Sequence, residues 1–116
     1  MMNTLDTARL IVDAIAGKLG SDILLLDISE VTLLADYFVI ATGDSSRQLD
    51  ALAADIRQQV KQQDNVTPHS TEGSADSGWV LLDYGGIVVH LFSPAQRQRY
   101  QLEELWSSAR TVVRIA

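Results

Sequence analysis

Three aspartates and one histidine are the side chains that come closest to a catalytic set. The aspartates lie in or beside short apolar segments and are Asp27, Asp36 and Asp83, while His90 shares a predicted hairpin with the last of them. Two-metal phosphoryl transfer needs acidic groups that converge on one point, commonly from alternate residues of one strand. Leu81 stands two positions before Asp83, and no acidic residue stands two positions from Asp27. A metal-dependent, nucleotidyltransferase-like enzyme is therefore kept only as the alternative to a non-enzymatic protein.

Other catalytic and cofactor motifs are also missing. Residues 43–46, Gly-Asp-Ser-Ser, open a predicted helix where backbone N–H groups could hold an anion. The glycine spacing and the lysine of a phosphate loop are absent, and Asp44 would repel a phosphate, so a turn with a helix cap is the simpler interpretation. His69 and His90 have no close ligand partner, no serine sits in a Gly-x-Ser-x-Gly elbow, and there is no cysteine. We expect no catalytic residue, no metal and no cofactor.

Composition narrows the class of protein. The chain has 116 residues, 47% of them hydrophobic and 21% charged, which predicts one folded domain over residues 1–116. The net charge of −6 disfavours direct binding to nucleic acid. Four C-terminal arginines form either a local basic patch for a partner or a solvated helix face: Arg97, Arg99, Arg110 and Arg114. No basic N-terminal segment leads into an apolar run, and no run approaches the roughly 20 apolar residues of a membrane span, so we expect a cytoplasmic protein.

Hydrophobic periodicity predicts the elements that position these side chains. Helical spacing from Leu5 to Leu19 predicts a first helix, and residues 23–28 and 37–41 are predicted strands. A capping box of Ser45 and Gln48 begins what should be the longest helix. Polar residues 63–78 predict a long surface connection.

The second half of the chain predicts a hairpin and a helical end. Residues 79–83 and 87–92 flank Gly85-Gly86, a dipeptide suited to a two-residue turn. Ser93, Pro94 and Gln96 then predict the start of a closing helix or of a pair of short helices. The fold class is therefore α/β or α+β, a mixed β-sheet layered with helices.

Alternation along this hairpin separates two faces. One face is almost wholly aliphatic, which predicts core: Val80, Leu82, Tyr84, Ile87, Val89 and Leu91. The other mixes aromatic and ionisable groups: Trp79, Leu81, Asp83, Val88, His90 and Phe92. Such a mixture suits a partner-binding surface with an aromatic anchor. Alternation alone leaves equally open a second, smaller core in which His90 and Asp83 satisfy each other.

Two stretches resemble the Iojap-like ribosomal silencing factor family. They are residues 35–48, ADYFVIATGDSSRQ, and residues 78–92, GWVLLDYGGIVVHLF. Glu72-Gly73 before the second stretch also fits, as do Arg97, Tyr100 and the segment 102–106 after it. Gly86 departs from the acidic residue usual in the family, which affects the detail of the turn.

The resemblance implies a non-enzymatic protein with a nucleotidyltransferase-like fold that lacks the catalytic carboxylates. It implies binding to the large ribosomal subunit through its fourteenth-numbered protein, steric blockage of joining with the small subunit, and repression of translation during starvation or stationary phase. It also implies a homodimer in the free state and favours the mixed face as the partner surface. The partner-binding residues carried over are Trp79, Leu81, Asp83, His90, Arg97 and Tyr100. Tyr100, together with Leu102 and Trp106, could instead pack the closing helix onto the sheet.

Overall fold

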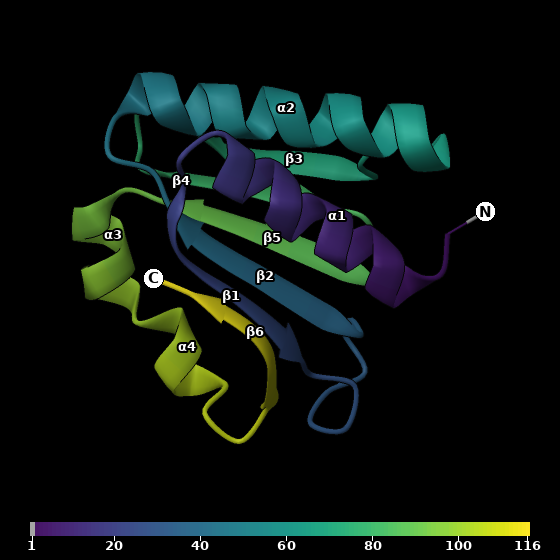
Figure 1. Cartoon of the computed structure of the whole chain (residues 1–116). Coiled ribbons are helices and arrows are strands. Elements are labelled where there is room, and N and C mark those ends of the chain that lie inside the picture. Colours follow the sequence, from purple (N-terminus) through teal and green to yellow (C-terminus); the bar gives the residue numbers. More distant parts are fainter. Residues whose placement is uncertain (1) are drawn as a thin grey trace.

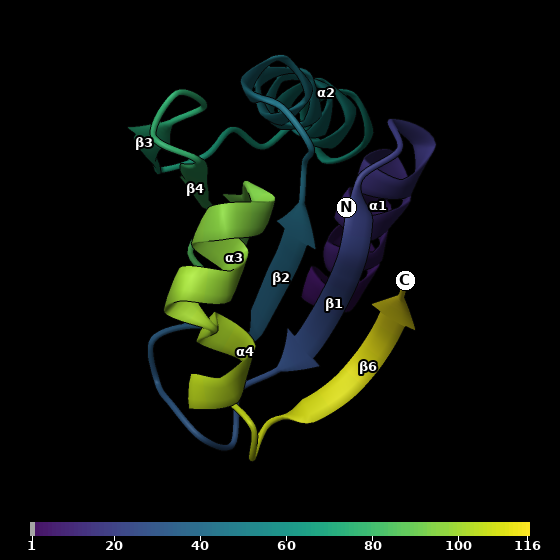
Figure 2. The ribbon, with the colours of Figure 1, turned by 90° about the vertical axis from the view of Figure 1, so that its left-hand side faces the viewer.

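The computed structural model describes residues 2–116 and contains a six-stranded sheet with helices on both faces (Figure 1). Helices α1 and α2 lie on one face, and the short helices α3 and α4 lie on the other (Figure 2). The elements follow the order α1 (Thr4–Gly17), β1 (Ser21–Asp27), β2 (Tyr37–Thr42), α2 (Ser46–Asp64), β3 (Ser70–Ser74), β4 (Trp79–Asp83), β5 (Ile87–Phe92), α3 (Pro94–Tyr100), α4 (Leu102–Leu105) and β6 (Arg110–Ile115).

The helices begin where their capping residues predict. The Ser45 hydroxyl accepts the Gln48 backbone N–H at 3.1 Å, and the Gln48 side chain accepts the Asp44 N–H at 2.6 Å. Ser93 likewise accepts the Gln96 N–H at 3.2 Å, with Pro94 at the first turn of α3. These bonds satisfy N–H groups that have no partner inside the helix. The predicted starts of α2, the longest helix, and of α3 are therefore confirmed.

The sheet has the strand order β3-β4-β5-β2-β1-β6, in which β2 and β5 pair in parallel and the other neighbours pair antiparallel. Trp79 lies opposite Phe92 and Leu81 lies opposite His90, which is the predicted hairpin register. Gly85 makes the turn at φ +84, in the left-handed region that favours glycine. The mixed α+β class is confirmed.

Two edge strands correct the predicted order of elements. Residues 63–78 were expected to form a surface connection, but Ser70–Ser74 form β3 against β4. The chain was expected to close on helices, but Arg110–Ile115 form β6 against β1. Every residue of β3 is exposed, and β6 has no buried residue. Neither edge therefore shows the hydrophobic alternation that identifies a half-buried strand.

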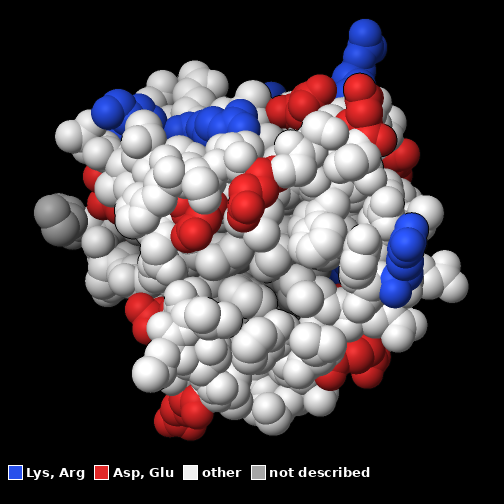
Figure 3. Space-filling view, turned by 180° about the vertical axis from the view of Figure 1, so that it is seen from behind, with Lys and Arg blue, Asp and Glu red and all other residues white. Residues whose placement is uncertain are grey.

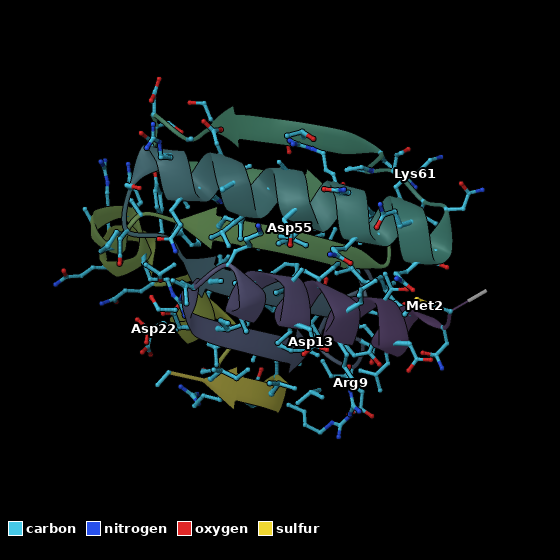
Figure 4. All side chains as sticks on the ribbon, turned by 45° about the horizontal axis from the view of Figure 1, so that its top comes forward. Met2, Arg9, Asp13, Asp22, Asp55 and Lys61 are labelled. Carbon is cyan, nitrogen blue, oxygen red and sulfur yellow. The ribbon has the colours of Figure 1, made fainter. Side chains whose placement is uncertain are left out.

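The main core lies between the sheet and the helices α1 and α2. The predicted core face of the hairpin is confirmed, because all six of its residues are buried: Val80, Leu82, Tyr84, Ile87, Val89 and Leu91. The solvent side of the two helices carries charged residues such as Arg9, Asp13 and Asp55 (Figure 4). Apolar and charged residues thus segregate to opposite sides of each helix, as amphipathic packing requires. No helix within residues 2–116 is long and apolar enough to cross a membrane.

Leu82 tests the importance of this core. The variant Leu82→Ala should lower the free energy of unfolding by about 2 to 5 kcal/mol, because it leaves a cavity beneath α2 in a fully buried site. Urea denaturation measures this loss. The matched control is Leu105→Ala in α4, where the leucine is 73% exposed and truncation should cost about 0.5 kcal/mol or less. Equal losses from the two variants would contradict the assigned core.

Candidate functional site

The face of the sheet opposite α1 and α2 is covered at one end and open at the other. Beneath α3 and α4 it forms a second core, made by Leu24, Leu26, Ile28, Ala35, Phe38, Ile40 and Phe92. Trp79, Val88, Leu102 and Trp106 are partly buried against this cluster. The alternative of a second core is therefore correct for Phe92, which is fully buried. Leu102 and Trp106 pack there, as the sequence allowed.

Trp79 is the centre of an aromatic stack at the boundary between the covered and open parts. Its ring centroid lies 5.0 Å from that of Phe92 beneath it and 4.7 Å from that of Tyr100 on α3. Trp79 is half-buried, and Tyr100 is 44% exposed. The stack therefore joins the second core to the surface, and its outer part can meet a partner.

His90 supports Trp79 from inside the sheet. The indole Nε1–H of Trp79 donates to Nδ1 of His90 at 3.3 Å, and the imidazole also packs edge-on against Phe38 at 4.9 Å. His90 is only 5% exposed, so it has little surface for direct contact with a partner. Burial lowers the pKa of His90 to about 4, which keeps the ring neutral near pH 7. An unprotonated Nδ1 can accept a hydrogen bond from the indole N–H, whereas a protonated Nδ1 cannot.

The acidic side chains Asp83 and Asp27 make local hydrogen bonds within the fold. Asp83 accepts the Gly85 backbone N–H at 2.7 Å and so closes the hairpin turn. It does not satisfy His90, whose hydrogen bond is with Trp79, so the alternative in which Asp83 and His90 pair is wrong. Asp27 accepts the Ser29 hydroxyl at 2.6 Å, and hydrogen bonds from Ser29 and then Arg110 hold its pKa below the usual value. Within residues 2–116 no three histidine, aspartate or glutamate side chains gather in a metal-binding group.

Arg97 faces inward, unlike a rim residue. Its side chain is 12% exposed and donates to Glu103, to the Thr42 hydroxyl and to the Asp22 carbonyl. Arg110 pairs with Asp27 at 3.2 Å. Two of the four arginines proposed as a basic patch are therefore engaged by carboxylates.

The open part of the face includes residues that the sequence did not single out as contacts. Glu72, Gly73 and Ser77 line a hollow of about 260 Å³ together with Trp79 and Leu81. They were missed because β3 was not predicted. Figure 3 shows this side of the molecule, where an area below the centre carries no Lys, Arg, Asp or Glu and acidic side chains lie above it and at its lower left and lower right. The site is thus an aromatic and aliphatic surface with an acidic margin.

The buried His90 should make stability depend on pH. Its pKa is about 4 in the fold and about 6.5 when unfolded, so the unfolded state binds the proton first as pH falls. The contribution of neutral His90 to the free energy of unfolding is complete above pH 6.5. It is lost progressively toward pH 4, by about 3 kcal/mol at most. Urea denaturation from pH 7.5 to 4 should show this loss, and His90→Phe should remove it while retaining an aromatic ring. A variant with the same pH profile as the parent protein would refute the assignment to His90.

Comparison with known proteins agrees with the geometry. A family model described as ribosomal silencing factor during starvation matches residues 1–115. The ribosomal silencing factor of Bacillus subtilis is 37% identical over 108 residues, which are 93% of this chain and 91% of that protein. The mouse protein named mitochondrial assembly of ribosomal large subunit protein 1 is 30% identical over 103 residues, 84% of this chain and 44% of its own length.

A solved structure extends the agreement from sequence to fold. The crystal structure of a Chromobacterium violaceum protein matches with a TM-score of 0.86 at 38% identity and covers 91% of this chain and 88% of that one. The sequence resemblance is thereby confirmed over nearly the whole length. Together, these matches show that the chain belongs to the ribosomal silencing factor family, whose members are named as regulators.

Proposed function

We propose that this protein binds the large ribosomal subunit through its fourteenth-numbered protein and sterically blocks joining with the small subunit, which represses translation during starvation. The observation that carries the proposal is the half-exposed stack of Trp79 and Tyr100 beside the hollow at Leu81. Aromatic side chains of this kind, set in a mainly apolar surface, are typical anchors of protein interfaces. The names of the family and of the mouse relative point to the ribosome.

The chemistry of the face favours a protein surface over ribosomal RNA as the main contact. A phosphate backbone would meet the Glu72 carboxylate at the hollow and a chain with a net charge of −6. Both charges oppose binding to nucleic acid. A protein partner with an apolar centre and basic groups around it would complement the face in shape and in charge.

Each site residue takes a distinct role in this proposal. Trp79 is the anchor, and Leu81 extends the apolar contact on β4. Tyr100 closes the other side of the stack from α3. His90 orients the indole of Trp79, and Asp83 fixes the turn at the end of β4. In the free protein the same apolar face would join two copies in a homodimer.

Steric blockage of subunit joining requires a folded protein of sufficient size and no reactive chemical group. The protein measures 33 × 32 × 24 Å along its principal axes. A body of this size on the joining face of the large subunit would occupy space that the small subunit needs. No cofactor or reaction enters this mechanism, and its site of action is the cytoplasm, where subunits join.

Subunit selectivity tests the proposed function directly. The purified protein should co-sediment with free large subunits and not with small ones at moderate salt, because the proposed docking surface is a protein of the large subunit. Adding small subunits afterwards should give fewer joined ribosomes than without the protein. Equal binding to both subunits would rule out the proposed docking.

Trp79 tests the location of the interface. Trp79→Ala should weaken binding to large subunits about thirtyfold, because truncation of a central aromatic anchor typically costs about 2 kcal/mol or more. It should also lower stability moderately, since the ring packs on Phe92. Leu19→Ala is the control, because Leu19 is 82% exposed and lies outside the face. A stability loss of about 3 to 5 kcal/mol with unchanged binding by the folded fraction would mean that Trp79 is only a core residue.

A further inference from the structure

Helix α3 presents Tyr100 to the aromatic stack, yet it has little packing of its own. Neither the seven residues of α3 nor the four of α4 include a buried residue. Helices this short are unstable in water by themselves, because too few hydrogen bonds offset the cost of nucleation. Some other interaction must therefore hold α3 in place over the sheet.

Gln96 of α3 donates to the Ser77 carbonyl at 3.0 Å, and the Arg97 guanidinium adds bonds to the middle of the sheet. Its Nη1 donates to the Asp22 carbonyl at 2.8 Å and to the Thr42 hydroxyl at 2.9 Å, and its Nε donates to Glu103 at 3.0 Å. These partners belong to β1, β2 and α4. One side chain of α3 therefore connects the helix to two strands of the sheet and to the next helix. Charge-assisted hydrogen bonds from a largely buried arginine are among the stronger polar contacts.

The backbone of β1 is shaped to receive Arg97. Asp22 has φ +48, in the left-handed region, and the pairing of β1 with β2 shifts register between Ser21 and Leu24. A non-glycine residue in this conformation is strained and persists only when its surroundings hold it. This irregularity lies at Asp22, whose carbonyl accepts a hydrogen bond from Arg97. A bulge that redirects a backbone group toward a site is a recurrent use of such irregularities.

Tyr100 lies one helical turn beyond Arg97, on the same side of α3. Its ring reaches Trp79 at 4.7 Å and Phe92 at 6.4 Å. We propose that Arg97 is a positioning residue, which fixes α3 on the sheet so that Tyr100 stacks on Trp79 before the partner arrives. This inference rests on the proposed function for its role in binding. A preformed surface binds more tightly, because its side chains need not be ordered during association.

A double-mutant cycle tests whether Arg97 acts through Tyr100. Arg97→Met should weaken binding to purified large subunits about tenfold in the parent protein. In a Tyr100→Ala background it should weaken binding less than about twofold, because Arg97 then has no Tyr100 ring to position. The matched control is Arg110→Met, which breaks the other arginine–carboxylate pair, at a side chain that is 72% exposed. It should leave binding unchanged. Equal losses from Arg97→Met in both backgrounds would mean direct contact or general destabilisation and would overturn the inference.

A second measurement needs no partner. The indole Nε1–H of Trp79, which donates to His90, gives its own indole NMR signal, and this signal senses the nearby ring of Tyr100. Arg97→Met should move this signal in the direction that Tyr100→Ala moves it, and Arg110→Met should not. If Arg97→Met fails to fold, Thr42→Val removes one of its bonds with little change in volume and should give a smaller shift of the same sign. An unmoved signal would overturn the inference.

The two proposals fail in different ways. If Tyr100→Ala binds large subunits normally, docking through this residue is wrong, and the NMR signal still decides whether Arg97 positions the ring. If Tyr100→Ala weakens binding but Arg97→Met leaves both the affinity and the signal unchanged, the docking surface stands and the positioning role is rejected.

Discussion

The alternation of side chains across β4 and β5 is the constraint on which the rest of the structure depends. Six apolar residues of the hairpin face α1 and α2 and are buried. Moving the pairing by one residue would place His90 and Asp83 in that core, so burial of one face fixes the register of the other. The position of Trp79 therefore follows from the core on the opposite side of the sheet. A side chain placed this way gains rigidity from packing on the opposite face of the sheet.

Polar contacts fix the orientation of the Trp79 ring, which the alternation of side chains alone does not determine. The sheet places Trp79 at a strand start, but the orientation of its ring depends on His90 below and on Tyr100 above. His90 can hold the indole because burial keeps it neutral, and α3 can hold Tyr100 because Arg97 connects the helix to β1 and β2. The surface is thus built from internal hydrogen bonds whose groups are largely hidden from the partner. Residues that shape such a site need not be residues that touch its ligand.

This arrangement explains which features could be predicted from the sequence. The helix caps and the hairpin register were predictable because their signals lie within a few residues of one another, as with Ser45 and Gln48. The edge strands β3 and β6 were not, since they exist only through pairing with a neighbour and lack a buried face. The role of Arg97 was also hidden, because Thr42 and Asp22 are 55 and 75 residues away in the chain. The hydrogen bond from the Gly85 amide to Asp83 was also not foreseen, because the sequence pattern indicated only contacts of Asp83 with His90 or with a partner.

The acidic balance of the chain fits the proposed binding to a ribosomal protein rather than to ribosomal RNA. A net charge of −6 disfavours residence on phosphate backbones, and Glu72 extends that repulsion to the hollow beside Trp79. Specificity is a difference of affinities, and repulsion from abundant wrong surfaces contributes to it as much as attraction to the right one. The aromatic centre would provide short-range attraction once a complementary protein surface is met. Charge would thus exclude most of the ribosome, and the stack held by His90 and Arg97 would select the docking point.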